Sequence, residues 1–350
     1  MKHTIYAILL LQCLAFASSA QSPFIDSTFG NNGRFTYNFS TGTEFSRLSG
    51  TALLPDGKIL GVGETVASVP GTVAAVVRCN ADGTLDASFG NGGEWISDDQ
   101  NFVIAGRVVV QPDQKILLAG FSYGTFKVVR LMPDGIYDPS FGVGGKANFT
   151  IWPISDLTQV FDMILQPDGK ILISGYTPWV NDRAIVRLKA NGTLDGAFGV
   201  FGKVIIKPSF FNADYFYLGG MAVTADNMIL TLGVYNQPNH PQVGFILRYK
   251  STGQRDTTFG TNGIALIPDI WTTGEIYVSP TNKILHLCAL YDSLTFGYKT
   301  TLIQWNADGT VDSSFANNGY AVFPAGTTQN GPRSGFLQAD GKLTVFGNRQ

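Results

Sequence analysis

Carboxylates, amides and aromatic rings gather in the most variable segments of this 350-residue sequence. Aromatic faces stack on sugar rings or peptide side chains, and neighbouring carboxylates and amides supply hydrogen bonds that orient such a ligand. We therefore predict a surface that recognises a glycan or a protein. Its candidate residues are Trp152, Trp179, Asn181, Asp182, Asp214, Tyr215, Tyr235, Asp269, Trp271 and Tyr291, and Phe210, Phe211 and Tyr217 lie in the same segments. Solvated carboxylates and rings that pack over the fold would give the same composition, so the sequence leaves both interpretations open.

Catalytic chemistry has few candidate groups. After residue 20 only His240 and His286 remain, and His286 lies in a strand-like segment, so neither a histidine-rich metal site nor a Ser-His-Asp triad is predicted. A two-carboxylate glycosidase needs no histidine, and a pair such as Asp214 with Asp269 keeps a glycan-cleaving enzyme as an alternative. A purely structural part of a larger surface protein is another. We predict no catalytic residue, metal or cofactor.

The overall composition argues against nucleic acid as a partner. The 24 basic and 26 acidic residues give a formal net charge of −2, and no run of Lys or Arg occurs. With 44% hydrophobic residues the chain is expected to fold, and its 41 glycines without a period of three indicate many turns between short elements. The oligomeric state is not determined by the sequence.

Three short elements recur in a fixed order along the chain. One is apolar-apolar-Arg, and another is Pro-Asp-Gly-Lys followed by apolar residues, which suits a tight turn. A fixed period of this kind is typical of repeat architectures. The remaining element, D-x-x-F-G, recurs at intervals of 52 to 61 residues, with Ala316 in place of the glycine in the last copy. Its copies begin at Asp26, Asp86, Asp138, Asp195, Asp256 and Asp312.

In four copies the arginine lies eight residues before the aspartate that follows it. We predict that each pair forms a charge-assisted hydrogen bond that holds the loop after the third strand over its sheet. In the fifth copy Gln304 takes the place of the arginine, before Asp312. The four pairs are Arg78 with Asp86, Arg130 with Asp138, Arg187 with Asp195, and Arg248 with Asp256.

Each period contains about four strand-like segments and no sustained helical periodicity. In the first full copy, residues 51–54 and 58–63 flank the Pro-Asp-Gly turn as a hairpin, and 74–79 and 94–97 follow. Four short antiparallel strands per repeat, repeated radially, are the organisation of a β-propeller. The sequence therefore predicts an all-β fold, a β-propeller of about six four-stranded blades with an incomplete last blade. A solenoid or a sandwich is the alternative.

The recurring pattern resembles the delta-60 repeat family. The resemblance is most specific in residues 166–172, QPDGKIL, and in 191–195, NGTLD, and it covers the chain from Asp26 to its end. It implies propeller-like blades in secreted bacterial proteins. It transfers no catalytic residue to this sequence.

The N-terminus is typical of a secretory signal peptide. Residues 1–20 combine a basic start, an apolar run over 5–16 and small residues at 18–20, which predicts cleavage near Ala20 and a secreted or cell-surface location. No later segment is apolar enough over about 20 residues to span a membrane. We expect a single repeat domain over 21–350, with five full repeats and partial terminal pieces.

Two further expectations concern the remainder of the chain. The two terminal pieces together lack a third strand, which indicates a truncated sequence. Cys79 and Cys288 remain after signal cleavage, in copies far apart along the chain, and we expect buried free thiols, with a disulfide as the alternative.

Overall fold

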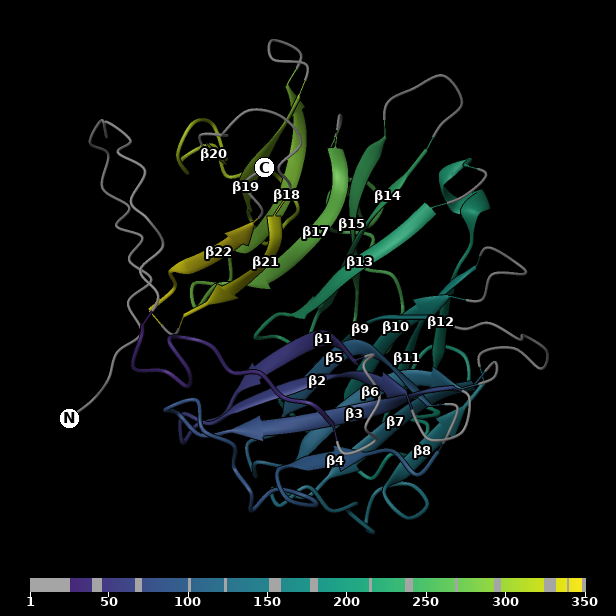
Figure 1. The fold of residues 1–350 in the computed structure, drawn as a ribbon. Coiled ribbons are helices and arrows are strands. Elements are labelled where there is room, and N and C mark those ends of the chain that lie inside the picture. Colours follow the sequence, from purple (N-terminus) through teal and green to yellow (C-terminus); the bar gives the residue numbers. More distant parts are fainter. Residues whose placement is uncertain are drawn as a thin grey trace. The chain divides into compact units, whose positions relative to one another are not determined.

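The regular secondary structure of the described residues is almost entirely β-strand (Figure 1). Within the described residues, the computed structural model contains five four-stranded sheets and one two-stranded sheet, each with its strands paired in chain order. This confirms an all-β propeller organisation in which the last sheet has fewer strands than the others. The described residues are 26–39, 46–66, 71–99, 102–122, 125–150, 159–176, 182–213, 216–236, 242–267, 270–292, 297–323, 332–338 and 340–347.

The first three sheets each correspond to one sequence repeat. Their strands are β1 (Ser46–Leu53), β2 (Ile59–Val66), β3 (Thr72–Cys79) and β4 (Glu94–Ile96), then β5 (Val103–Val110), β6 (Ile116–Ser122), β7 (Thr125–Leu131) and β8 (Lys146–Phe149), then β9 (Gln159–Leu165), β10 (Ile171–Tyr176), β11 (Arg183–Leu188) and β12 (Lys203–Ile206).

The later sheets follow the same order, after a short 3-10 helix, η1 (Pro208–Phe211). Their strands are β13 (Phe216–Val223), β14 (Ile229–Tyr235), β15 (Val243–Tyr249) and β16 (Ile264–Ile267), then β17 (Ile270–Val278), β18 (Ile284–Asp292), β19 (Gly297–Trp305) and β20 (Tyr320–Val322), and finally β21 (Pro332–Leu337) and β22 (Leu343–Gly347).

The Pro-Asp-Gly elements form the predicted hairpin turns between the first two strands. In the first copy Leu54 donates its N–H to the Lys58 carbonyl at 2.8 Å, and Gly57 closes the turn with a positive φ of 84°. Asn282 occupies the corresponding position of the fifth copy at φ 60°. Asparagine tolerates this left-handed conformation better than most residues, which explains why it replaces glycine there.

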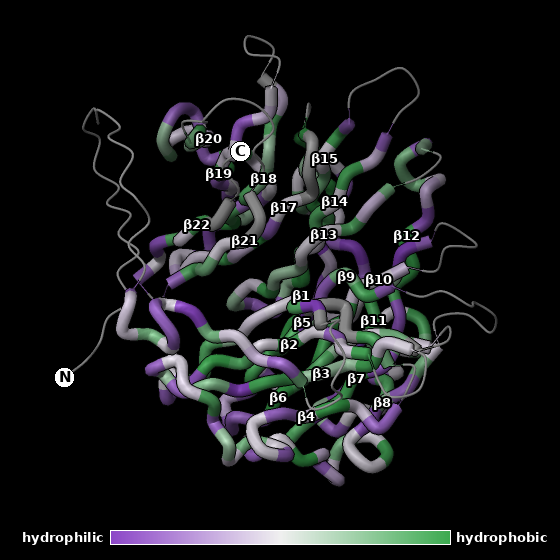
Figure 2. Tube along the Cα trace, viewed as in Figure 1, coloured by the Kyte–Doolittle hydropathy of each residue, from purple (hydrophilic) through white to green (hydrophobic). Residues whose placement is uncertain are grey.

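The first and second sheets bury one another's faces. Successive strand residues point to opposite faces, so Leu60 and Val62 of β2 form one cluster with Leu118 of β6 and Leu131 of β7, and all four are fully buried. Figure 2 shows hydrophobic residues concentrated along β2, β3 and β6. The core is therefore built between repeats rather than within each one.

The expectation for the cysteines is confirmed. Cys79 and Cys288 are both buried and free. His286, in β18, is also buried.

The chain divides into two compact units. The amino-terminal unit comprises Ile25–Met221 with Tyr249–Gln254, and the carboxy-terminal unit comprises Ala222–Arg248 with Arg255–Gln350. A single repeat domain over 21–350 stays a prediction, as does the signal peptide over 1–20, which lies outside the described residues. Within the described ranges, no helix is long and apolar enough to span a membrane.

Candidate functional site

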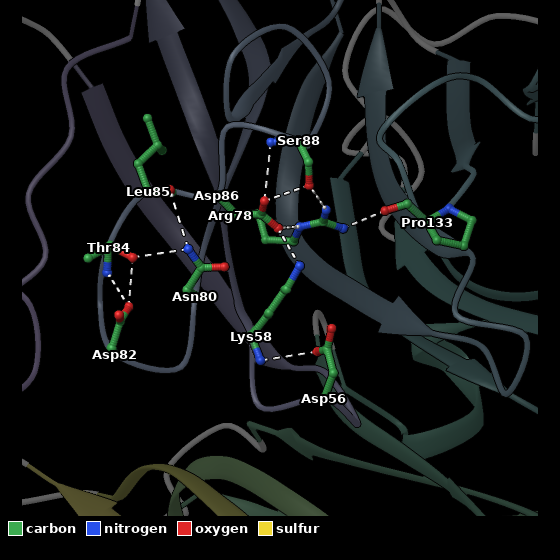
Figure 3. Close-up of polar contacts among 10 residues, drawn as sticks. All are labelled: Asp56, Lys58, Arg78, Asn80, Asp82, Thr84, Leu85, Asp86, Ser88 and Pro133. Atoms are coloured by element: carbon green, nitrogen blue, oxygen red, sulfur yellow. Dashed lines mark hydrogen bonds and ion pairs between the residues drawn. The ribbon is translucent and has the colours of Figure 1, made fainter.

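Arg78, near the end of β3, forms a buried ion pair with Asp86 in the loop that follows (Figure 3). Arg78 Nε donates to Asp86 Oδ2 at 2.7 Å, and Lys58 Nζ lies 2.8 Å from the same oxygen. The other carboxylate oxygen accepts hydrogen bonds from the Ser88 hydroxyl at 2.6 Å and the Ser88 N–H at 3.2 Å. Burial raises the pKa of Asp86, but the bonds from Lys58 and Ser88 and the charge of Arg78 outweigh it and hold that pKa well below its ordinary value.

The same bond recurs in the other repeats. In the fifth copy Gln304 Nε2 donates to Asp312 Oδ2 at 2.8 Å, so a neutral amide replaces the guanidinium. Each repeat thus ties its third strand to the loop that follows. The Nε to Oδ2 distances are 2.8 Å for Arg130 with Asp138, 2.9 Å for Arg187 with Asp195 and 2.7 Å for Arg248 with Asp256.

These arginines also bind the following repeat, which the sequence does not indicate. Arg130 Nη1 donates to the Ala190 carbonyl at 2.6 Å, across 60 residues of sequence. Arg78 likewise donates to the carbonyl of Pro133. Every residue carries a carbonyl oxygen, so no sequence signal marks the acceptor of such a bond.

The phenylalanine of D-x-x-F-G packs beneath a turn glycine of the next repeat. Phe89 is fully buried, and a Cβ added to Gly135 would lie 2.9 Å from its Cε2 atom. Gly90, beside Phe89, donates its N–H to the Asp134 carbonyl at 2.6 Å. The repeated arginines, phenylalanines and glycines therefore join adjacent repeats, and functional residues must be sought elsewhere.

Acid is expected to weaken the ion pair between Arg130 and Asp138. Burial raises the pKa of Asp138, but hydrogen bonds from Ser140 and the charge of Arg130 outweigh it and lower the pKa to about 2. Because the folded pKa lies below the unfolded value of about 3.9, its contribution to stability is present above that value and is lost as the pH falls from about 4 to about 2. Thermal unfolding of the wild type should show a steeper fall of Tm over this range than that of Asp138→Asn. An equal fall of Tm with pH in the two proteins would show that protonation of Asp138 does not cause the loss of stability.

A second group of polar and aromatic side chains lies where β10 ends and β11 and β13 begin. We call Tyr176, Asp182, Arg183, Phe216 and Tyr217 the Arg183 cluster. Arg183 is 3% exposed, and its guanidinium carbon lies 4.5 Å from the Tyr176 ring centroid, 5.1 Å from that of Phe216 and 5.8 Å from that of Tyr217. Its Nη2 donates to the Phe216 carbonyl at 2.5 Å. Cation–π contacts and this hydrogen bond fix the orientation of the rings.

The Arg183 cluster continues into exposed aromatic rings. Tyr217 is 49% exposed and Phe210 is 39% exposed. Phe210 lies 4.9 Å from Phe211, and Phe211 lies 5.1 Å from Phe216, measured between ring centroids. A chain of ring contacts therefore connects exposed Phe210, through η1, to the buried arginine and to exposed Tyr217.

Asp182 is the predicted ligand residue that the structure places in this cluster. It is half-buried, and its carbonyl accepts a hydrogen bond from Arg183 Nη1 at 3.4 Å. Burial raises the pKa of the Asp182 carboxyl, against the charges of Lys207 and Arg183. Arg183 was not a candidate, because an arginine at the start of an apolar strand gives no sign of the rings around it.

The other predicted ligand residues lie outside the Arg183 cluster. Tyr291 is 42% exposed, with its ring centroid 5.5 Å from that of Tyr298. Tyr235 differs from the expectation of an exposed ring: it is 7% exposed at the end of β14, where its ring lies 6.2 Å from Phe245. Trp271 belongs to β17, but its side chain lies outside the description. The remaining candidates fall outside the described residues: Trp152, Trp179, Asn181, Asp214, Tyr215 and Asp269.

Among the residues that the structure describes, no three His, Cys, Asp or Glu side chains gather closely enough to hold a metal ion.

The chain resembles several solved structures at low sequence identity. Solved structures that resemble the chain include an α-L-arabinanase of Penicillium chrysogenum, with 12% identity, TM-score 0.43, and 86% of this chain and 92% of that chain covered. A GH43 beta-1,3-galactosidase has 11% identity, TM-score 0.38 and coverages of 75% and 91%. Prolyl oligopeptidase B of Galerina marginata has 11% identity, TM-score 0.39 and coverages of 83% and 36%.

Sequence comparisons give a family match. No curated protein matches the chain. A family model described as "Domain of unknown function (DUF5122) beta-propeller" matches residues 54–89, 111–141 and 166–198. Each matched stretch runs from just before the first hairpin turn of a repeat to the phenylalanine of its D-x-x-F-G element. The chain is thus similar to this β-propeller family in three of its repeats.

Proposed function

We propose that this protein is a secreted or cell-surface binding module that recognises a glycan or a protein through the Arg183 cluster and the aromatic rings beside it. The observation that carries the proposal is the pair of exposed rings, Tyr217 and Phe210, joined by ring contacts to the buried Arg183. Trp179 and Asn181, which lie in sequence between Tyr176 and Asp182, fall outside the described residues and stay predicted ligand residues.

The chemistry of these groups suits a sugar better than an apolar ligand. An exposed aromatic face stacks on the C–H face of a pyranose ring, and the half-buried Asp182 carboxylate supplies an acceptor for sugar hydroxyls. The buried guanidinium holds Tyr217 in place before the ligand arrives, which reduces the conformational entropy lost on binding.

Binding to a panel of immobilised polysaccharides tests this proposal. Tyr217→Ala is expected to weaken binding of the ligand found by about tenfold, the loss of about 1.4 kcal/mol of stacking. Phe201→Ala is the matched control, because Phe201 is 82% exposed but lies in the turn before β12. Wild-type affinity in both Tyr217→Ala and Phe210→Ala would contradict the proposed surface.

The glycan-cleaving alternative rests on Asp214 and Asp269. This alternative requires that the protein release products from the same polysaccharide panel and that Asp214→Asn abolish this release.

A further inference from the structure

A cavity lies between the N-terminal segment 29–39 and the first sheet. Its volume is about 420 Å³, within the usual range of ligand sites. One wall consists of aromatic rings from the segment, including Phe35 and Phe39, and the other consists of residues of β1, β2 and β3. Tyr37 anchors the segment, because its hydroxyl donates to the Glu94 carboxylate at 3.0 Å. The cavity is separate from the Arg183 cluster.

The repeat identifies residues 34–39 as the counterpart of a fourth strand. Arg34 follows Asp26 by eight residues, as Glu94 of β4 follows Asp86. In the complete sheets the fourth strand pairs with the third, with Val77 opposite Glu94 in the first copy. Among the described residues, no third strand pairs with the segment, whose one bridge joins Gly30 and Arg34.

The opposite wall is a face that other copies bury against a preceding sheet. In the second copy this face carries Leu118 and Leu131, both fully buried against residues of the first sheet. The corresponding residues of the first copy are Gly61 and Cys79, and both line the cavity. Neither residue carries a large side chain, but a Cβ added to Gly61 would lie 3.2 Å from Leu48 Cδ1. Leu48 is 66% exposed, so an added strand requires this side chain to change its rotamer.

We infer that this cavity is a docking slot for one extended strand from a partner polypeptide, with the apolar-apolar-Arg pattern of a third strand. The strand pairs antiparallel with residues 34–39, a form of recognition in which backbone hydrogen bonds give affinity and side-chain pockets give specificity. By the register of the complete sheets, the residue before the partner's arginine lies opposite Arg34. The inference goes beyond the binding function proposed above and does not depend on it.

A peptide with the sequence of β7, Thr125–Leu131, is a suitable probe because it is a third strand of this repeat. We expect saturable binding by isothermal titration calorimetry, no binding of a scrambled peptide, and slower amide hydrogen exchange over residues 34–39 in the complex. Gly61→Leu fills the slot and should weaken peptide binding by at least about tenfold.

The Gly61→Leu variant is expected to fold, since Leu118 and Ile173 occupy the same strand position in the next two copies. Gly196→Leu is the matched control, because a Cβ at Gly196 meets no atom within 4 Å. Absence of peptide binding, or equal binding by Gly61→Leu and wild type, would overturn the inference. So would a protein dimer in sedimentation that saturating peptide dissociates, since the slot would then hold a second copy of the chain.

Discussion

Replacement of Arg130 by methionine is expected to lower the free energy of unfolding by about 3–5 kcal/mol, as when one partner of a buried ion pair is removed. Arg130 is 6% exposed and Asp138 is 3% exposed, so the carboxylate would stay buried with Lys115 Nζ, 3.3 Å away, as its remaining cation. The variant also loses the bond from Nη1 to the Ala190 carbonyl, which joins two repeats. Methionine preserves much of the side-chain volume, so the effect reports the polar contacts.

Arg130→Gln is expected to lower the free energy of unfolding by a smaller amount, about 1–3 kcal/mol. The fifth repeat provides the precedent, because Gln304 Nε2 donates to Asp312 Oδ2 at 2.8 Å in the same position. Urea unfolding of the three proteins measures the difference. Arg47→Gln is the control, since its side chain is 71% exposed and the change should stay within about 0.5 kcal/mol. Equal losses in the two Arg130 variants would show that the bond to Asp138 does not set the stability.

Gly135→Ala is expected to destabilise the protein by about 2–5 kcal/mol, through backbone strain and overpacking together. Gly135 has a φ of +87°, and an added Cβ would lie 2.7 Å from the backbone nitrogen of Gly90 and 2.9 Å from the Phe89 ring. The methyl group would separate two repeats at the point where Gly90 donates to the Asp134 carbonyl.

Gly169→Ala separates the effect of backbone strain from the effect of overpacking. Gly169 has a similar φ of +79°, but its added Cβ would meet its nearest atom, Ala190 Cβ, at 3.5 Å. Only the backbone strain remains, and we expect a loss of about 1–2 kcal/mol. Urea unfolding of both variants under the same conditions measures the difference. A loss in Gly135→Ala no greater than in Gly169→Ala would show that the turn does not hold the next repeat.

The partners of the repeated ion pairs could be predicted because each lies within one repeat. Arg130 and Asp138 are separated by a strand end and a turn of constant length, so their covalent spacing brings the side chains together. The hairpin turns could be predicted for the same reason, since Gly57 closes a turn within four residues.

The candidate binding surface was less predictable, because exposure depends on packing between strands. Asp182 and Tyr235 both flank variable connections, yet Asp182 joins the Arg183 cluster and the Tyr235 ring is buried beside Phe245. Their sequence neighbours give no indication of which side chain points into the core.

Short-range spacing is enough to predict the repeat, the all-β organisation and the pairing of each arginine with its aspartate. The tertiary structure sets the contacts between repeats, because the acceptor of Arg130 Nη1 is a backbone carbonyl 60 residues away. It also decided that Arg183 lies among aromatic rings, and that Gly61 and Cys79 line a cavity where the next copy has buried leucines. These features arise when strands distant in sequence pack side by side. The spacing of residues within one segment therefore does not predict them.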